Sequence, residues 1–254
     1  MIIAVGSFRG FGATTTAFAL ASAAAALHPD GAWLVEADPA GGVLAGRVHL
    51  APFAIGGLER VAFPTDRATA VEALHEVAQM VGQVSVVTAP ADSFRAFACH
   101  QPRLPWIPAL RELTGTVVVD VGRMRAGTPA WPLLQSADQV LLVTSAEVSA
   151  MVASDEWLRA GGRVSPSDAG LQGQRCQLVV VESPSGIAFP RSALSSDLGD
   201  RCVGWLPWDP NAVDLLHRGA AHSDRRLRRS SLVQATQLLA TKVLTNVSNG
   251  VAAA

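Results

Sequence analysis

Residues 5–21 read VGSFRGFGATTTAFALA, and this stretch decides how the rest of the chain is interpreted. Its first residues complete an apolar strand, Gly10 and Gly12 form a turn, and the following alanines and threonines favour a helix. The backbone N–H groups of such a turn, together with the helix N-terminus, attract phosphate. The stretch contains no lysine. It is therefore a nucleotide site without its key cation, a different cofactor site, or a tight turn.

Short apolar runs follow along the chain and alternate with helical patterns. The runs are near-continuous, as in TVVVD at 116–120 and QVLLVT at 139–144, which is typical of strands covered by helices on both faces. This alternation predicts an α/β fold with a doubly wound, mostly parallel sheet of about seven strands in a three-layer arrangement. Ligands then bind at the carboxyl ends of the strands. The predicted strands are 1–6, 33–37, 83–89, 116–121, 139–145, 176–182 and 202–206.

Helices are expected between these strands, and the chain reads as a single unit. Residues 39–65 are glycine-rich and are expected to form a long excursion over the top of the sheet. Because no repeat or linker interrupts the pattern, residues 1–246 are predicted to form a single domain, followed by a frayed C-terminal tail at 247–254. The predicted helices are 13–27, 66–81, 106–113, 147–160, 187–196, 210–217 and 229–246.

The composition argues against several classes of protein. The chain has 254 residues, 49% of them hydrophobic, and a net charge of −1, so it can bury a sizeable core and nucleic acid is an improbable partner. Its three cysteines lack metal-site spacing, and the start MIIAVGS reads as a strand rather than a secretory leader, so we expect a cytoplasmic location. No apolar run reaches the roughly 18 residues that span a bilayer, so any membrane contact is expected to be peripheral.

The glycine turn itself has three competing interpretations. It is a strand-to-helix turn without a ligand, a dinucleotide-binding turn, or a P-loop that departs from its pattern. The spacing G-x-x-x-G-x-G resembles that of short-chain dehydrogenases, whose chemistry uses a tyrosine with a nearby lysine. Because the chain has no tyrosine, a dehydrogenase of that kind is excluded. A dinucleotide-binding, Rossmann-like protein stays an alternative.

Four later segments favour the P-loop interpretation. They are, in chain order, WLVEADPAGG at 33–42, TVVVDVG at 116–122, ADQVLLVTSAEVSAM at 137–151 and GWLPWDPNAVDLLHRG at 204–219. With the glycine turn they resemble the MinD/ParA family of deviant Walker P-loop ATPases, including degenerate, TadZ-like members associated with pilus localisation. The resemblance runs across nearly the whole chain. It implies ATP or ADP with Mg²⁺ as cofactor, and a homodimer or a protein partner of a localisation or assembly machine.

The resemblance carries over to the glycine turn residue by residue. The family's K-G-G-x-G-K-T-T loop falls on residues 8–15. Phe8 stands in place of the signature lysine, which crosses a dimer interface to the partner's nucleotide, and Ala13 in place of the lysine that reaches the phosphates. The cofactor-binding residues implied in this way are Arg9, Gly10, Phe11, Gly12, Ala13, Thr14, Thr15, Pro207 and Asp209.

The acidic residues of the family motifs are present. Glu36 matches the first acid of the family and Asp120 its Walker B-like acid, and with Thr14 they are the implied Mg²⁺ ligands. Asp38 matches the acid that orients the attacking water and is the implied catalytic residue. The metal side of the site is thus retained, whereas both cationic groups are missing.

The missing cations lower the expected activity. Lys242 is the only lysine of the chain, so an arginine must substitute, and Arg9 is the candidate because a guanidinium can bind phosphate bidentately. Losing one charge-stabilising group commonly costs about 10²–10³ in rate. We therefore expect a pseudo-ATPase that binds ATP weakly or not at all and serves pilus or secretion, division or segregation machinery. The alternative is an active ATP-dependent dimer switch in which Arg9 replaces the lost lysine.

Three surface features bear on partners. The run DRRLRR at 224–229 is short within a near-neutral chain, so a solvated helix start is favoured over contact with nucleic acid. The last helix has a polar face of glutamine and threonine instead of the basic face of membrane-binding helices, so a packing role is favoured. Phe8 and Phe11 on an exposed loop suggest a dimer interface that is apolar and independent of nucleotide.

Overall fold

The structure is a computed structural model. It describes residues 1–48, 50, 57–63, 66–101, 104–125, 127–163, 171, 176–183, 191–221 and 224–252, with side chains described as far as residue 246. Part of the glycine-rich excursion at 39–65 and residues 187–190 of the predicted helix 187–196 lie outside these ranges.

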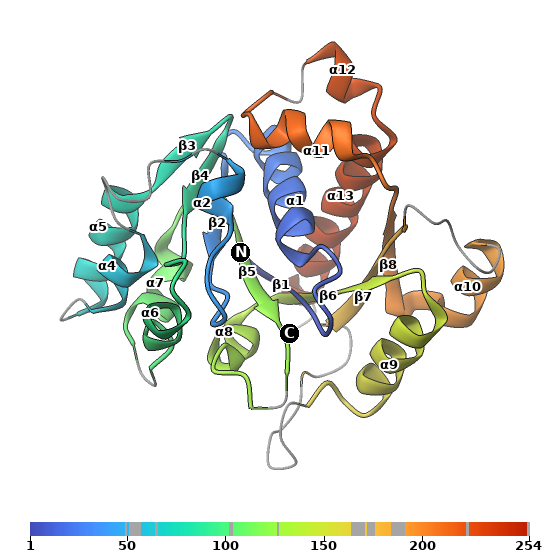
Figure 1. Ribbon diagram of the computed structural model, residues 1–254, viewed down its shortest axis with the longest axis horizontal. Coiled ribbons are helices and arrows are strands. Elements are labelled where there is room, and N and C mark those ends of the chain that lie inside the picture. The colour runs from blue at the N-terminus through green and yellow to red at the C-terminus, as the bar shows by residue number, and fades with distance from the viewer. Residues whose placement is uncertain are drawn as a thin grey trace.

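One sheet forms the middle of the molecule (Figure 1). Within the described residues it has eight strands in the order β3-β4-β2-β5-β1-β6-β7-β8, and every neighbouring pair is parallel except β3 with β4. This confirms the predicted α/β fold. The strands are β1 (Ile2–Ser7), β2 (Ala32–Glu36), β3 (Gln79–Val81), β4 (Val84–Val87), β5 (Thr116–Arg123), β6 (Gln139–Ser145), β7 (Cys176–Val181) and β8 (Cys202–Leu206).

The eighth strand corrects one predicted helix. The sequence predicts a helix over 66–81, but α5 ends at Val77 and residues 79–81 form β3, the antiparallel edge strand. Gly82, with a φ of 61°, allows the tight turn that returns the chain into β4. The helical pattern in the sequence therefore extends past the end of α5, into residues whose backbone pairs with β4 at the edge of the sheet.

Alternate residues of the strands point to opposite, equally buried faces. In β1, Ile2 and Ala4 join the core on one face, and Ile3 and Val5 join the core on the other. The same alternation recurs in β2, β5, β6 and β7. Burial on both faces explains why the strands are continuously apolar in sequence.

Helices cover both faces of the sheet. The core on one face receives side chains from α1, α2 and α11 to α13, and α1 lies beside α13 (Figure 1). The core on the opposite face receives side chains from α4, α5 and α7 to α10. The helices are α1 (Ala13–Leu27), α2 (Leu44–Arg47), α4 (Leu58–Ala62), α5 (Arg67–Val77), α6 (Ser93–Ala98), α7 (Trp106–Ala109), α8 (Trp131–Ser136), α9 (Val148–Arg159), α10 (Arg191–Leu198), α11 (Pro210–His217), α12 (Arg225–Arg228) and α13 (Ser231–Ala252), with 3₁₀ turns η1 (Leu110–Glu112) and η3 (Gly199–Arg201).

Most differences from the predicted helices concern short elements. The predicted helix 106–113 divides into α7 and η1, and α2, α4, α6, α8 and α12 have no predicted counterpart. Helices of four to six residues contain too few turns for a hydrophobic period to be visible in sequence. The last helix continues to Ala252, beyond the predicted domain boundary at residue 246.

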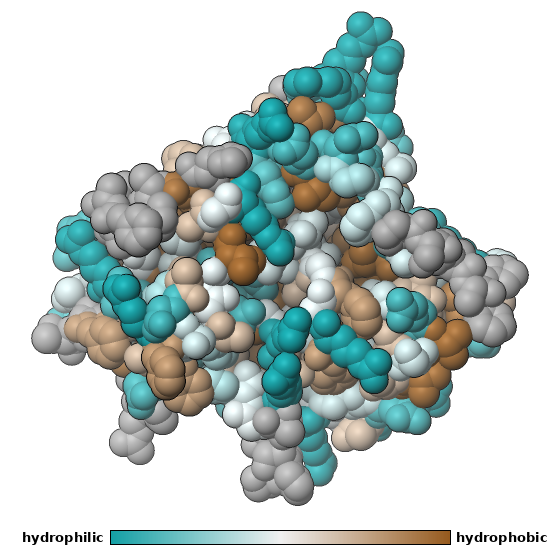
Figure 2. Space-filling view, in the orientation of Figure 1, coloured by the Kyte–Doolittle hydropathy of each residue, from teal (hydrophilic) through white to brown (hydrophobic). Residues whose placement is uncertain are grey.

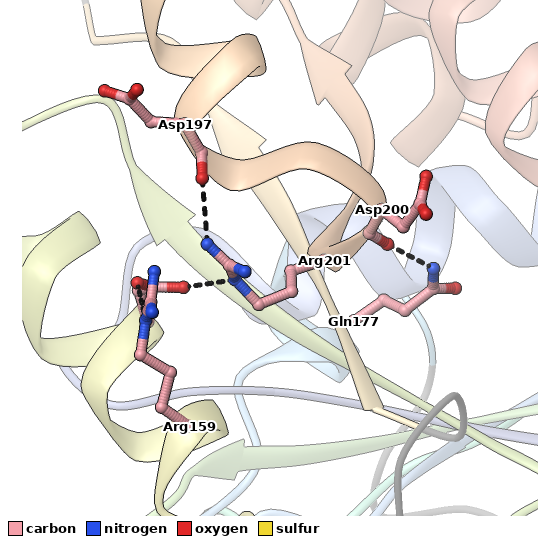
Figure 3. Close-up of polar contacts among 6 residues, drawn as sticks. Arg159, Gln177, Asp197, Asp200 and Arg201 are labelled. Atoms are coloured by element: carbon pink, nitrogen blue, oxygen red, sulfur yellow. Dashed lines mark hydrogen bonds and ion pairs between the residues drawn. The ribbon is translucent and has the colours of Figure 1, made fainter.

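A polar network joins α9, β7 and the turn η3 (Figure 3). Asp155 of α9 accepts a hydrogen bond from Arg159 Nε and another from Arg201 Nε, each at 2.6 Å. Gln177 of β7 donates to the carbonyl oxygen of Asp200 at 2.9 Å. These contacts fix the end of η3 against α9 and β7.

Candidate functional site

The glycine turn joins β1 to α1 at the carboxyl end of a central strand. Gly10 and Gly12 have φ angles of 75° and 83°, which residues with a side chain rarely adopt. The Phe11 N–H donates to Ser7 Oγ at 3.1 Å, and α1 begins with a bond from the Thr16 N–H to the Gly12 carbonyl oxygen at 2.9 Å. The turn thus presents the helix N-terminus at the sheet edge where α/β proteins bind ligands.

Asp120 lies beside the start of α1, near the Thr14 hydroxyl. It is fully buried; its Oδ1 accepts the Gly122 N–H at 3.0 Å, and its Oδ2 has no hydrogen-bond partner among the described residues. Burial raises the pKa of Asp120 to about 6, and the neighbouring Thr14 hydroxyl and Gly122 N–H oppose the rise. Oδ2 makes no hydrogen bond of normal geometry within the described residues, although the Thr14 hydroxyl is near enough to lower the pKa of the carboxyl group. A buried carboxylate oxygen without a well-formed hydrogen bond is costly, so this position suits a cation.

Glu36 is the register partner of Asp120 on the adjacent strand β2. Its Oε1 accepts the N–H groups of Val43 and Leu44 at 2.7 and 2.8 Å, and its Oε2 accepts that of Ala89 at 3.0 Å. Burial raises the pKa of Glu36 to about 7, with the charge of Asp120 adding to the rise and the three N–H groups opposing it. The carboxylate therefore holds the start of α2 beside the turn, a function that the sequence does not reveal.

Asp38 follows β2 and approaches the end of β5. Its Oδ1 accepts the Ala40 N–H at 2.8 Å, and its carboxyl group lies against Gly122, where an added Cβ would be 2.0 Å from Asp38 Cγ. Burial raises the pKa of Asp38, and the charges of Arg123 and Arg125 oppose the rise. The three acids named from the sequence are thus brought together around the glycine turn.

Solved structures share this architecture. A ParA family ATPase from Chlorobium tepidum superposes with a TM-score of 0.70 at 13% identity, over 94% of this chain and 97% of that one. The cell division ATPase MinD of Pyrococcus furiosus gives 0.70 at 19%, over 96% and 98%. MinD of Pyrococcus horikoshii, solved in complex with Mg-ADP, gives 0.64 at 18%, over 96% of each chain. The chain has the MinD/ParA fold. No family model matches it, and no curated protein matches it by sequence.

Phe8 and Ala13, the two residues that the resemblance aligns with the family's lysines, are partly or fully buried. Ala13 is 5% exposed at the start of α1. Phe8 is half-buried, and its ring packs edge-on against Trp157 of α9 with centroids 5.1 Å apart. The side chain of Phe8 is therefore engaged within its own chain, which weakens the idea that it forms an apolar dimer interface.

Three arginines lie around the turn, and the sequence singled out one of them. Arg9 is exposed, and no hydrogen bond or ion pair involves it within the described part of the chain. Arg123, at the end of β5, lies over the turn, since a Cβ added to Gly10 would be 3.0 Å from its Nε. Arg47 of α2 donates through Nη1 to Thr15 Oγ1 at 3.4 Å. No sequence signal marks Arg47; Arg123 follows Asp120 by three residues, which is the only hint of its position.

The segment of Pro207 and Asp209, which the resemblance assigns to cofactor binding, makes structural contacts in this chain. Asp209 caps α11 by accepting the Ala212 N–H at 3.0 Å, and its Oδ2 accepts Ser230 Oγ at 2.7 Å. Pro207 is half-buried, whereas Trp208 is 54% exposed. The Asp209 carboxylate thus links α11 to the start of α13, and its contact with a cofactor stays a prediction.

Lys242 lies far from the glycine turn along the sheet. With Arg191 and Trp205 it lines a cavity of about 280 Å³ between α10, β8 and α13. The strands β6 and β7 separate β8 from β1. Among the helices described, none is both long and apolar enough to cross a membrane.

Proposed function

We propose that this chain is a positioning or regulatory protein of the MinD/ParA type that binds Mg-ATP or Mg-ADP weakly and hydrolyses ATP slowly. The observation that carries the proposal is the contrast between Asp120 and Ala13. Asp120 presents a buried, unpartnered carboxylate oxygen beneath Thr14, whereas the phosphate-lysine position holds a buried alanine. The metal side of a nucleotide site is kept and its main cation is gone.

The residues present fit a magnesium nucleotide in three ways. The turn from Gly10 to Gly12 and the N-terminus of α1 offer backbone N–H groups to phosphate oxygens. The Thr14 hydroxyl and Asp120 Oδ2 would hold Mg²⁺, which when bound neutralises phosphate charge. The related fold solved with Mg-ADP supports this assignment. Asp38, beside Gly122, would orient water.

Slow turnover follows from the charges that are missing. Phosphoryl transfer depends on positioning and on neutralising the charge that develops in the transition state. The loss of one such group commonly costs about 10²–10³ in rate, and neither Phe8 nor Ala13 can supply it. A protein of this kind acts by changing its homodimerisation or its contacts with a partner in pilus, secretion, division or segregation machinery.

Calorimetry with ATP and ADP in the presence of Mg²⁺, on protein free of copurified ligand, tests the proposal. We expect a Kd between about 10 µM and 1 mM, and a mass that changes with nucleotide in light scattering. No binding up to millimolar nucleotide would overturn it. Titration with NADH, followed by fluorescence, tests the dinucleotide alternative in the same preparation.

A gain-of-function pair sharpens the test. Ala13→Lys restores the missing ammonium, whereas Ala13→Met adds a side chain of similar length without charge. We expect the lysine variant to bind ATP at least about tenfold more tightly than the wild type, and the methionine variant not to do so. Equal affinities of the two variants would contradict the assignment of Ala13 to the phosphate position.

A further inference from the structure

The glycine turn is not without cations, because two arginines from distant parts of the sequence reach it. Arg123 comes from the last position of β5, where it is the register partner of Ser7 at the end of β1. A Cβ added to Gly10 would lie 3.0 Å from Arg123 Nε and 3.2 Å from its Nη2. The guanidinium group therefore lies directly over the turn, and its charge opposes the rise that burial causes in the pKa of Asp38.

Arg47 reaches the other side of the turn, at the start of α1. Its Nη1 donates to Thr15 Oγ1 at 3.4 Å, and its charge acts on the buried Asp120. Its position depends on Glu36, which accepts the N–H groups of Val43 and Leu44 at the start of α2. The fully engaged Glu36 thus places the guanidinium of Arg47 near the first turn of α1.

A separate observation, the buried carboxyl group of Asp120, favours a cationic ligand between these groups. Asp120 is 0% exposed, and its Oδ2 has no hydrogen-bond partner among the described residues. The carboxyl group of Asp120 lies near the Thr14 hydroxyl. Thr14 precedes Thr15, the residue that Arg47 contacts. Figure 2 shows strongly hydrophilic side chains in the middle of this face, where the ends of β1 and β5 meet.

We propose that Arg123 and Arg47 are the phosphate-binding cations of this site, and that they clamp a nucleoside di- or triphosphate over the glycine turn from β5 and α2. The proposal rests on the proposed function, and it assigns the positive charge of the phosphate site to two residues other than Arg9. Both side chains are exposed, so their guanidinium groups can move onto an incoming phosphate. A planar guanidinium binds phosphate through two parallel hydrogen bonds, which a single lysine cannot do.

The test compares single alanine variants by calorimetry with Mg-ATP. Arg123→Ala and Arg47→Ala are each expected to weaken binding about tenfold to hundredfold, which is the usual range for a hydrogen bond to a charged group. Arg9→Ala is the competing variant, because Arg9 is the cation that the sequence places on the same turn, and within the described residues it makes no hydrogen bond or ion pair. The clamp predicts a smaller loss of affinity in Arg9→Ala than in either of the other two variants. Because all three arginines are exposed, their melting temperatures should match that of the wild type.

Inorganic pyrophosphate with Mg²⁺ is the second probe, because it carries the phosphates without the nucleoside. A wild type that binds it, with the same loss in Arg123→Ala and Arg47→Ala, supports the clamp even if ATP binds poorly. Wild-type binding that is unchanged in both variants, or that is lost in Arg9→Ala instead, overturns the clamp and leaves the proposed function standing. A wild type that binds neither pyrophosphate nor ATP overturns both.

Discussion

The carboxyl group of Asp38 packs directly against Gly122 near the end of β5, in the space that a side chain at residue 122 would need. A Cβ at Gly122 would lie 2.0 Å from both Asp38 Cγ and Asp38 Oδ2, and the φ of Gly122 is 62°. Only glycine permits this approach, because it has no Cβ and tolerates the left-handed region of backbone conformation. Gly122, two residues after the strand acid Asp120, thus allows the close approach of a second acid, Asp38, which follows the neighbouring strand β2.

Gly122→Ala should therefore destabilise the protein by about 2–4 kcal/mol, combining backbone strain and overpacking. Urea unfolding measures this cost. Gly46→Ala is the control, because a Cβ there meets nothing within 4 Å and the residue lies in helix α2. It should be neutral or slightly stabilising. In an Asp38→Ala background the cost of Gly122→Ala should fall, and an unchanged cost would show that the contact with Asp38 is not responsible.

Asp120 should make stability depend on pH in a direction opposite to that of most carboxyl groups. Its pKa rises from 3.8 to about 6 on folding because the carboxyl group is buried. The folded protein therefore keeps a proton between about pH 4 and 6 that the unfolded chain has lost, so this group's contribution to stability falls as pH rises through that window. The full effect is roughly 3 kcal/mol.

Asp120→Asn removes this effect. The free energy of unfolding of the wild type minus that of the variant should fall between pH 4 and 7, when both are measured in urea at each pH. The charge of Asp120 also raises the pKa of Glu36, and this coupling acts in the same direction. A difference that stays flat across the window would mean that Asp120 titrates normally in the folded protein.

Phe8 and Trp157 should be energetically coupled. Their rings meet edge-on at 5.1 Å, a geometry worth about 0.5–1.5 kcal/mol beyond the burial of apolar area. A double-mutant cycle with Phe8→Ala and Trp157→Ala measures the coupling. Phe94→Ala is the control, since Phe94 is 85% exposed and should change stability by less than about 0.5 kcal/mol. If Phe8 instead stabilised a dimer, its effect on unfolding would depend on protein concentration.

Asp209 should be important for the folding of the C-terminal helices. Its carboxylate caps α11 through the Ala212 N–H and accepts a hydrogen bond from Ser230 Oγ. Asp209→Ala should cost about 1–3 kcal/mol and reduce hydrogen-exchange protection in α11. Asp214→Ala, which removes an exposed ion pair with Arg218 in the same helix, should cost less than about 1 kcal/mol. Equal costs would rule out a special function of the cap.

Much of the fold could be predicted from local pattern. The seven predicted strands appear within two residues of their expected ends, because burial on both faces makes each strand a visible apolar run. The edge strand β3 was missed because three residues at the edge of a sheet carry little pattern, and their pairing depends on the turn at Gly82. Short helices such as α2 and α4 were missed for the same reason.

The candidate site was predictable only in part. Asp120 and Glu36 could be placed together because each ends an apolar strand, and the carboxyl ends of parallel strands meet at the same edge. Their different surroundings could not be predicted, since Glu36 is engaged by three backbone N–H groups and Asp120 Oδ2 by none. Sequence proximity pointed to Arg9, whose contact with phosphate stays a prediction, and the structure adds Arg47 and Arg123 beside the turn.

The sequence by itself determined the α/β class, the strands of the central sheet and the glycine turn that lacks both lysines, because each depends on residue types within a short window. Only the tertiary structure decided which side chains surround that turn. Arg47 reaches it because Glu36 holds the start of α2, and Arg123 reaches it because β5 pairs with β1. Such contacts depend on how distant segments pack against one another, and local periodicity carries no record of that packing.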